Sequence, residues 1–444
     1  MDIVFALLLS FGLLVVSVLR GVFVAYPLLV AMALVLVMLR RRGFGWNALL
    51  QMAIAGSRQS FPVLSVLLPI GALVAVWIAA GTVPALVYYG VQLIQPRTFI
   101  LAAFVLTGLV SWLIGTSFGA VGTVGIALMI MASGSGANRH LIAGAIIAGA
   151  YVGDRCSPMS SSAHLVASVT ATRLLTNIRG MWRSSLLPLG LTLLIYGGLS
   201  WCYPIQLDRA FTEQMATLFN LHPLTLLPAV LILGLALLRV EVKRSMLLST
   251  VCAGAIALTL QSYAPEQLGM FTLTGFQLNS GTSLDLILSG GGLLSMARVS
   301  LVVILSTAFV GLFAGTQCLS IVKRWLPHDP SPSQRFLTTS LIGTAAAAFG
   351  CTQTIAILLT QDLVRTKYQD AATGAANLAL DLENTVVVIS PLIPWNIAGL
   401  VPATILMTDA GFIPYAVYLY LLPLLGWLTL KGERRWPRLM QHNL

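Results

Sequence analysis

Long apolar runs separated by short polar segments dominate the chain. The clearest runs lie at about 3–19, 22–39, 62–80, 98–114, 140–172, 184–202, 222–238, 245–262 and 299–319. A helix needs about 20 apolar residues to cross a bilayer. The pattern therefore predicts an all-α polytopic membrane protein with about 10–12 transmembrane segments. A shorter amphipathic piece at about 83–95 is expected to lie at the membrane interface.

Composition and charge support a membrane protein. Hydrophobic residues make up 57% of the 444 positions and charged residues only 9%, whereas a soluble domain carries roughly 25%. The net charge of +11 comes from 25 Lys and Arg that mostly fall between apolar runs, as in cytoplasmic loops under the positive-inside rule. We therefore expect no nucleic-acid partner. The cluster Arg40–Arg42 and the basic tail predict that both termini are cytoplasmic, in the cell inner membrane.

Polar and helix-breaking residues interrupt the apolar runs at related places in the two halves of the chain. The first break, at 153–158, runs from Gly153 to Pro158, and the second half has breaks near 350–354 and 382–396, the latter with Pro391 and Pro394. Matched positions lie 235, 229 and 233 residues apart (115 and 350, 154 and 383, 157 and 390). Such interrupted spans are typical of secondary transporters with inverted repeats. We therefore divide the chain into a first half (1–202), connecting spans (203–297) and a second half (298–444), with broken or re-entrant helices in both halves.

Asp154 is the first candidate for the chemistry of the site. A lone carboxylate at bilayer depth is costly in its charged form, so it can hold a proton or a cation and exchange one for the other. Pro158 frees backbone carbonyls of the helix. Hydroxyl oxygens come from Ser157, Ser160, Ser161 and Ser162. Oxygen ligands of this kind suit a hard cation such as Na⁺. The alternative is structural, with Asp154 paired to Arg155 or capping a helix.

Glu383 is the second candidate, and Asp381 lies two residues before it. Carboxylates at this spacing repel each other when both are charged, so one of them tends to keep its proton and is suited to carry and then release it. We therefore assign Asp154, Ser157 and Glu383 to the binding of a cation or proton. The alternative for Glu383 is a loop end that is exposed to water.

Weaker candidates for contact with a substrate are the polar residues around the breaks. They are Thr116, Ser117, Ser160, Ser161, Ser162, Thr352, Gln353, Asn384, Thr385 and Asn396. Ser and Thr are also common at ordinary helix contacts in membranes, so packing is the alternative for the hydroxyls. The sequence shows no metal-ligand spacing, phosphate loop or nucleophile–base motif. We therefore expect no enzyme activity, no cofactor, and no metal beyond Na⁺ at Asp154.

Three stretches resemble the NhaC family of Na⁺/H⁺ antiporters, which belongs to the wider ion-transporter superfamily. They are residues 115–128 (GTSFGAVGTVGIAL), 148–160 (AGAYVGDRCSPMS) and 390–399 (SPLIPWNIAG). The resemblance covers about 115–407 in order and spacing. It implies an inverted-repeat transporter that exchanges Na⁺ and H⁺ at a site between its halves. Some members of this family move malate and lactate or amino acids.

The chain departs from the family's pattern just after the first Ser-Pro motif. Where similar antiporters carry Ser-Asp-Thr-Thr-Asn, residues 160–164 read Ser-Ser-Ser-Ala-His. A second carboxylate is therefore missing at Ser161, and one often present in the family near Thr352 is missing too. Fewer carboxylates weaken a Na⁺ site and favour a neutral or zwitterionic substrate.

These observations lead to one hypothesis and two alternatives. We expect a secondary active transporter, a Na⁺/H⁺ antiporter with Na⁺ and H⁺ as its coupling ions. The alternative within transport is Na⁺- or H⁺-coupled movement of an amino acid or small carboxylate, with the serine cluster and Asn396 meeting the substrate. The alternative from another class is a membrane-embedded enzyme. The expected partners are a small ion or small molecule, the lipid bilayer, and a second copy of the chain in a homodimer.

Overall fold

The computed structural model describes residues 2–133, 137–205, 209–238, 240–278, 280–281, 284–314, 331–368 and 374–432. Within these ranges the chain forms helices and short helical turns without a strand, and one isolated bridge joins Phe276 and Gly290. The predicted all-α class is thereby confirmed. The basic tail contributed to the predicted orientation of the chain. Lys431 is described, whereas the part of the tail beyond residue 432 lies outside the described residues.

The helices follow one another along the chain in three groups. The first group is α1 (Asp2–Leu19), α2 (Ala25–Arg41), α3 (Trp46–Arg58), α4 (Phe61–Ala79), α5 (Thr82–Leu93), α6 (Phe99–Ile114), α7 (Ser117–Ala120), the π-helical η2 (Val121–Gly125), α8 (Ile126–Ser133), α9 (Arg139–Cys156), α10 (Ser161–Val169) and α11 (Leu174–Cys202). The second is α12 (Arg209–Leu218), α13 (Leu227–Leu237), α14 (Val242–Thr259), α15 (Pro265–Thr274), α16 (Leu284–Ile287) and α17 (Ala297–Ala314). The third is α18 (Pro332–Gly350), α19 (Gln353–Val364), η6 (Arg365–Tyr368), α20 (Gly374–Asn384), α21 (Val386–Ile389), η7 (Ser390–Leu392), α22 (Ile397–Ile405), η8 (Ala410–Tyr415) and α23 (Val417–Gly432).

Several of these helices are long and apolar enough to cross a membrane. Among the described residues four qualify: Phe61–Ala79, Pro96–Ile114, Leu174–Cys202 and Leu294–Leu312. A fifth would be the broken pair Gly374–Leu392 and Ile397–Ile405, which bends by 52°. Shorter apolar helices such as Ser117–Ser133 and Val417–Lys431 lie between them. The protein is therefore a multi-pass membrane protein, while the number of 10–12 crossings and the inverted relation of the halves stay predictions.

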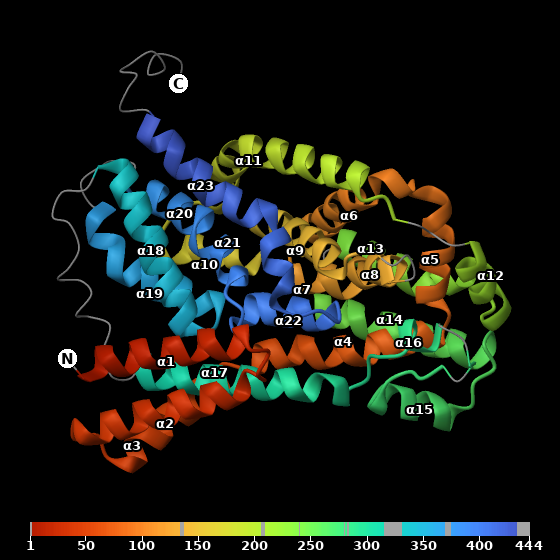
Figure 1. The fold of residues 1–444 in the computed structure, drawn as a ribbon, viewed down its shortest axis with the longest axis horizontal. Helices are drawn as coiled ribbons and strands as arrows, with labels where there is room; N and C mark the ends of the chain where they lie inside the picture. Colours follow the sequence, from red (N-terminus) through yellow and green to blue (C-terminus); the bar gives the residue numbers. More distant parts are fainter. Residues whose placement is uncertain are drawn as a thin grey trace.

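The two halves are intermixed around the breaks. α10, from the first half, packs against α19 and α20 of the second, and Figure 1 shows these helices gathered with α18 and the end of α23 at one end of the molecule. The opposite end holds α5, α12 and α15. The first break therefore lies inside a bundle that is built largely from the second half.

Close packing of α6 on α9 fixes the position of the first break. A Cβ atom on Gly153 would lie 2.4 Å from both the carbonyl oxygen of Gly108 and the amide nitrogen of Trp112. Glycine is thus required for the backbones to come this near, as small residues allow at helix contacts in membranes. The Ser111 hydroxyl adds a bond of 2.5 Å to the carbonyl of Ala150 on α9.

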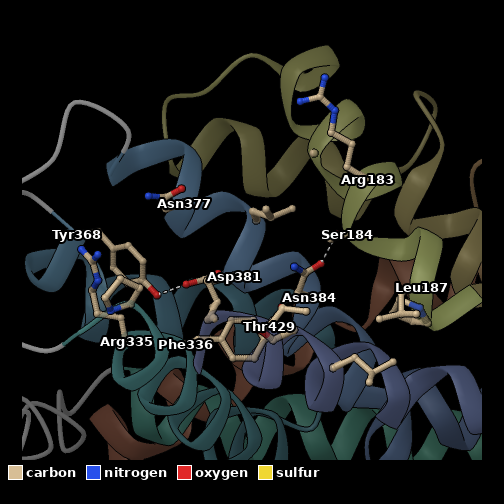
Figure 2. A pocket seen from close by; sticks show the side chains of 17 residues that line it. Arg183, Ser184, Leu187, Arg335, Phe336, Tyr368, Asn377, Asp381, Asn384 and Thr429 are labelled. Atoms are coloured by element: carbon tan, nitrogen blue, oxygen red, sulfur yellow. Dashed lines mark hydrogen bonds between the residues drawn. The ribbon is translucent and has the colours of Figure 1, made fainter. Parts of the chain in front are cut away.

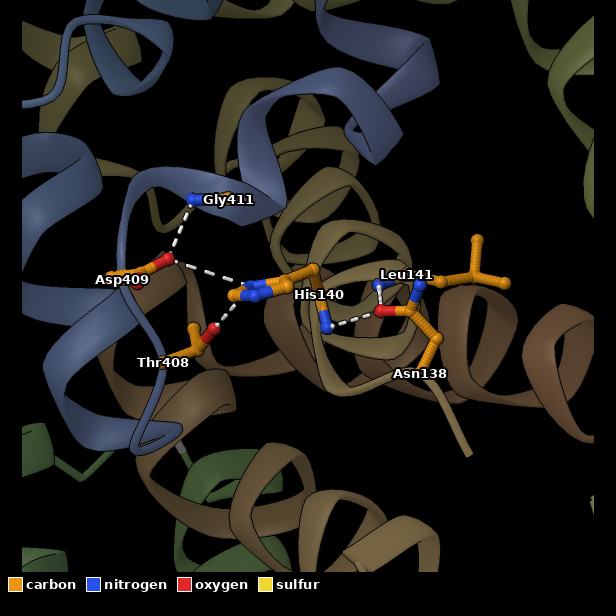
Figure 3. A network of polar contacts seen from close by, with 6 residues as sticks. All are labelled: Asn138, His140, Leu141, Thr408, Asp409 and Gly411. Carbon is orange, nitrogen blue, oxygen red and sulfur yellow. Dashed lines mark hydrogen bonds and ion pairs between the residues drawn. The ribbon is translucent and has the colours of Figure 1, made fainter. Parts of the chain in front are cut away.

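A polar network ties the first turn of α9 to the turn that follows α22 (Figure 3). His140 Nδ1 lies 3.0 Å from Thr408 Oγ1 and 3.5 Å from an oxygen of Asp409. Asn138 caps α9 by accepting from the backbone N–H of His140. These contacts join the N-terminal end of α9, the helix that leads into the first break, to the C-terminal end of α22, the helix that follows the last break.

Candidate functional site

The first pair of breaks begins where two helices end on a left-handed residue. α6 ends at Gly115 with φ +76°, and α18 ends at Cys351 with φ +50°. In each case an extended threonine follows, Thr116 or Thr352, and the next helix begins directly after it. Thr352 caps α19 by accepting from the N–H of Ile355 at 3.2 Å. The Gly-Thr-Ser and Cys-Thr-Gln sequences therefore form the same local structure.

The second pair of breaks also shares one design. α9 ends at Cys156, and after three residues the extended Ser160 caps α10. After η7 the chain reaches Asn396, an extended residue that caps α22 by accepting from the N–H of Ala398 at 2.9 Å. Pro158 lies in the first of these loops and Pro394 in the second, so these two predicted prolines fall on real helix breaks. Pro391 lies in η7, and Gly153 lies inside α9, which continues to Cys156, so the prediction that Gly153 breaks the helix is wrong.

The structure corrects the register of the repeat. The left-handed residues (115 and 351), the prolines (158 and 394) and the capping residues (160 and 396) are each 236 residues apart. Two hydrogen bonds between the breaks have acceptor carbonyls 236 residues apart, although their donors are 238 apart. Ser157 Oγ donates to the carbonyl of Trp112 at 2.7 Å, and Trp395 Nε1 donates to the carbonyl of residue 348 at 2.7 Å. The counterpart of Asp154 is therefore Ser390. The offset of 229 that paired Asp154 with Glu383 does not hold, and neither does the offset of 233 that paired Ser157 with Ser390.

Asp154 lies where the two breaks of the first half meet. Its carboxylate is only 5% exposed. Ser117 Oγ donates to one oxygen and Ser160 Oγ to the other, each at 3.1 Å. Ser162 Oγ lies 2.9 Å from Ser160 Oγ and extends the cluster. Among the described residues no ion pair reaches Asp154, so neutral hydroxyls surround this carboxylate.

Arg155, which the sequence offered only as a partner for Asp154, has different neighbours. The side chain is fully buried. Its Nε donates to the carbonyl of Glu383 at 3.1 Å. Its two terminal nitrogens donate to Ser185, Tyr418, the carbonyl of Met181, Ser184 and Asn384. The guanidinium thus uses its donors on neutral oxygens from α11, α20 and α23. The structural alternative of an Asp154–Arg155 pair is therefore not what the structure shows.

Glu383 is the second buried carboxylate, and it is not exposed to water as the alternative required. The residue is 0% exposed, and within the described part of the chain neither carboxylate oxygen has a hydrogen-bond partner. Asp381 has different surroundings, because its Oδ2 accepts from Tyr368 at 2.6 Å. A buried carboxylate without donors is costly when charged, so Glu383 is suited to hold a proton or a bound cation.

The remaining predicted residues divide between the site and the scaffold. Thr385 donates to the carbonyl of Asp381 at 2.6 Å, and Gln353 Nε2 donates to the carbonyl of Val387 at 3.1 Å. Asn396 donates to a carbonyl of α18 at 2.8 Å. Ser161 is exposed, unlike the other serines of its cluster. Side-chain hydrogen bonds within or between the breaks come from Ser157, Thr352, Gln353, Thr385 and Asn396, while Thr116, Pro391 and Pro394 contribute to the shape of the backbone there.

The donor set around Asp154 fits a small hard cation and not a transition metal. No group of three or more His, Cys, Asp or Glu that could hold a metal is found among the described residues. Carboxylate and hydroxyl oxygens are available from Asp154, Ser117, Ser160 and Ser162. Such oxygens are the ligands that hard cations prefer.

Broken helices that place buried carboxylates inside an apolar bundle define a membrane transporter. The profile of the Na⁺/H⁺ antiporter family matches residues 2–163 and 149–428. The chain therefore belongs to the Na⁺/H⁺ antiporter family, and the resemblance seen in the sequence is confirmed.

Characterised relatives span almost the whole chain and carry different cargo. A malate-2H⁺/Na⁺-lactate antiporter of Bacillus subtilis is 28% identical over 383 residues, 84% of this chain and 82% of the relative. The Na⁺/H⁺ antiporter NhaC of Alkalihalophilus pseudofirmus is 27% identical over 433 residues, 94% of this chain and 93% of the relative. The arginine/ornithine antiporter ArcD of Halobacterium salinarum is 27% identical over 435 residues, 96% of this chain and 89% of the relative. All three names describe transporters.

Proposed function

We propose that the protein is a Na⁺/H⁺ antiporter of the cytoplasmic membrane, with Asp154 as the carboxylate that binds Na⁺ and H⁺ in turn. The observation that carries this proposal is the Asp154 cluster. A buried carboxylate is held by two hydroxyls and meets no fixed cation in the described residues. Family membership and the NhaC relatives support the same function.

The exchange follows from the cost of charge in a dry site. An ionised Asp154 without a partner is expensive at this depth. A proton on the carboxylate removes the charge, and Na⁺ at the same oxygens neutralises it, so one replaces the other. When Na⁺ binds, the hydroxyls of Ser117 and Ser160 can turn their lone pairs toward it, since a hydroxyl both donates and accepts. Glu383 is the second carboxylate of the site, supplied by the other half.

The test measures proton movement in everted membrane vesicles loaded with a pH-sensitive dye. Respiration acidifies the lumen and quenches the dye, and adding NaCl should restore fluorescence if Na⁺ enters as protons leave. Asp154→Asn should abolish the response, because the amide cannot take up or release a proton. Glu266→Gln is the matched control, since Glu266 is exposed in the first turn of α15. Full activity of Asp154→Asn would remove this residue from the mechanism.

One observation favours a second candidate function, the exchange of a small organic acid or amino acid. A cavity of about 660 Å³ lies between α11, α18, α20 and α23, which is far more space than a bare ion needs. The relatives named for malate and lactate or for arginine and ornithine show that such cargo occurs at this degree of identity. If malate, lactate or arginine moves the dye signal and NaCl alone does not, this second function replaces the first.

A further inference from the structure

A cavity of about 660 Å³ lies between α11, α18, α20 and α23, and Asp154 is not among the residues that line it. α20 lines it with Asp381 and Asn384, and α11 lines it with Ser184. Figure 2 shows Asp381 bonded to Tyr368 on one side of the cavity and Asn384 bonded to Ser184 on the other. Ionisable and amide groups at membrane depth face protein partners or water-filled space. The cavity is therefore suited to hold water.

The floor of this cavity adjoins the buried site. Asn384 Oδ1 accepts from both Ser184 and Arg155, and Arg155 in turn donates to the backbone carbonyl of Glu383. Ser184 and Asn384 line the cavity, whereas Arg155 is fully buried behind them. One layer of side chains thus separates the cavity from the residue that carries the unpartnered carboxylate.

Asp381 supplies the negative charge inside the cavity. The residue is 8% exposed, and its Oδ2 accepts from Tyr368, whose hydroxyl also lies 2.8 Å from Thr339 Oγ1. Arg335 lies over the Tyr368 ring, 5.5 Å from its centroid, and forms no ion pair with Asp381 in the described part of the chain. The Tyr368 hydroxyl therefore orients the Asp381 carboxylate without neutralising it, and an incoming cation could do so.

The charges around the cavity indicate the side to which it opens. Arg183 and Arg335 line it, and Lys431 lies in the last turn of α23 at the same end of the bundle. Basic residues of this kind mark the cytoplasmic side of membrane proteins. By contrast, the space beside Met159 at the first break is only about 10 Å³, which is the room of a single water at most.

We propose that this cavity is the cytoplasmic vestibule of the transporter, in which Asp381 binds the transported cation before it reaches the buried carboxylates. The contacts among Asn384, Arg155 and Ser184 form its closed floor. The proposal rests on the function proposed above, because it takes a cation as the cargo. Passage onward requires Asn384 to exchange its contacts with the Ser184 hydroxyl and the Arg155 guanidinium.

The location of the vestibule can be tested without measuring transport. Leu425 lines the cavity and its neighbour Leu424 does not, although Leu424 is 50% exposed. A membrane-impermeant maleimide should label Leu425→Cys in everted vesicles, above the level of the unmodified chain, and should label Leu424→Cys much less. In right-side-out vesicles, where the cytoplasmic face is enclosed, Leu425→Cys should not be labelled. Equal labelling of Leu424→Cys and Leu425→Cys, or labelling of Leu425→Cys only in right-side-out vesicles, would overturn the vestibule.

The role of Asp381 is tested by the concentration dependence of exchange. Asp381→Asn should raise the KM for Na⁺ at least about fivefold, the effect of one unit charge at contact distance in water, while the maximal rate persists. Tyr368→Phe keeps the carboxylate and should shift KM less. An unchanged KM in Asp381→Asn would refute the cation site. If Leu425→Cys is labelled as expected but neither the parent protein nor any variant exchanges protons for Na⁺, the Na⁺/H⁺ function and the Asp381 cation site are wrong. The assignment of the cavity as a cytoplasmic vestibule then still stands.

Discussion

Replacing Gly153 by alanine should disable the protein through a single methyl group. The added Cβ would lie 2.4 Å from the backbone of α6 at Gly108 and at Trp112. An ordinary contact needs about 3.5 Å, and backbone atoms cannot rotate away as a flexible side chain can. α6 and α9 must therefore separate by roughly 1 Å.

That separation acts directly on the carboxylate. Ser117 follows the end of α6 and Asp154 lies on α9, so their bond of 3.1 Å would lengthen to about 4 Å, beyond hydrogen-bonding distance. A hydrogen bond to a charged group contributes roughly 1.5–3 kcal/mol. Its loss changes the equilibrium between ionised and protonated Asp154 by about 10- to 150-fold. Overpacking adds a further cost of about 1–3 kcal/mol in stability.

The assay combines apparent melting of the purified protein in detergent with Na⁺-dependent proton movement in everted vesicles. Gly197→Ala is the matched control, because Gly197 also lies within a helix but a Cβ there would meet nothing within 4 Å. The control should melt at or slightly above the temperature of the parent, since alanine favours the helix. Gly153→Ala should melt lower and lose most of its exchange. Indistinguishable behaviour of the two variants would refute the packing argument.

Three further changes separate the site from its scaffold. Ser117→Ala and Ser160→Ala should each raise the KM for Na⁺ by roughly tenfold or more, because each removes one hydroxyl that contacts the Asp154 carboxylate, while the exposed Ser161→Ala should leave KM unchanged. Arg155→Met should lower the free energy of unfolding by more than about 1.5 kcal/mol and should lower the melting temperature with it, whereas Arg155→Lys should recover part of that loss. Equal melting temperatures of the Met and Lys variants would contradict a stabilising role for the hydrogen bonds of Arg155. Trp395→Phe should cost about 1 kcal/mol by removing the indole donor to a carbonyl of α18, with exchange preserved above the detection limit, and an unchanged melting curve would count against that bond.

The sequence was sufficient to locate the breaks and the first carboxylate. Glycine, proline and clustered hydroxyls gather near the points where the backbone leaves the helix, so local composition marks the neighbourhood of Gly153–Pro158 and Ser390–Asn396, although α9 continues past Gly153 to Cys156. The proximity of Ser117 to Asp154 was anticipated only in part, since both were candidates but nothing in the sequence joined them. That contact depends on how α6 packs on α9, and the packing of two helices cannot be predicted from the amino-acid composition of either segment alone.

Other features required the three-dimensional structure. Arg155 follows Asp154 directly, and a neighbouring opposite charge suggests an ion pair. Adjacent residues of a helix point about 100° apart, and here the guanidinium turns toward α11, α20 and α23 instead. The register of the repeat was also misjudged. Matching carboxylate to carboxylate paired Asp154 with Glu383, whereas the caps and left-handed residues fix the offset at 236.

The corrected register has a consequence for charge. Asp154 corresponds to Ser390, whose hydroxyl donates to the carbonyl of Val386 and is fully buried. The loop of the second half, residues 385–396, contains no Asp or Glu. The two halves therefore share the scaffold of caps and carbonyl contacts but not the ionisable group. The second half instead supplies its carboxylate from within α20, at Glu383, beside the backbone carbonyl that holds Arg155. With two carboxylates and one fixed guanidinium, the buried site is neutral when it carries one cation or one proton, and this balance favours exchange of a single charge at a time.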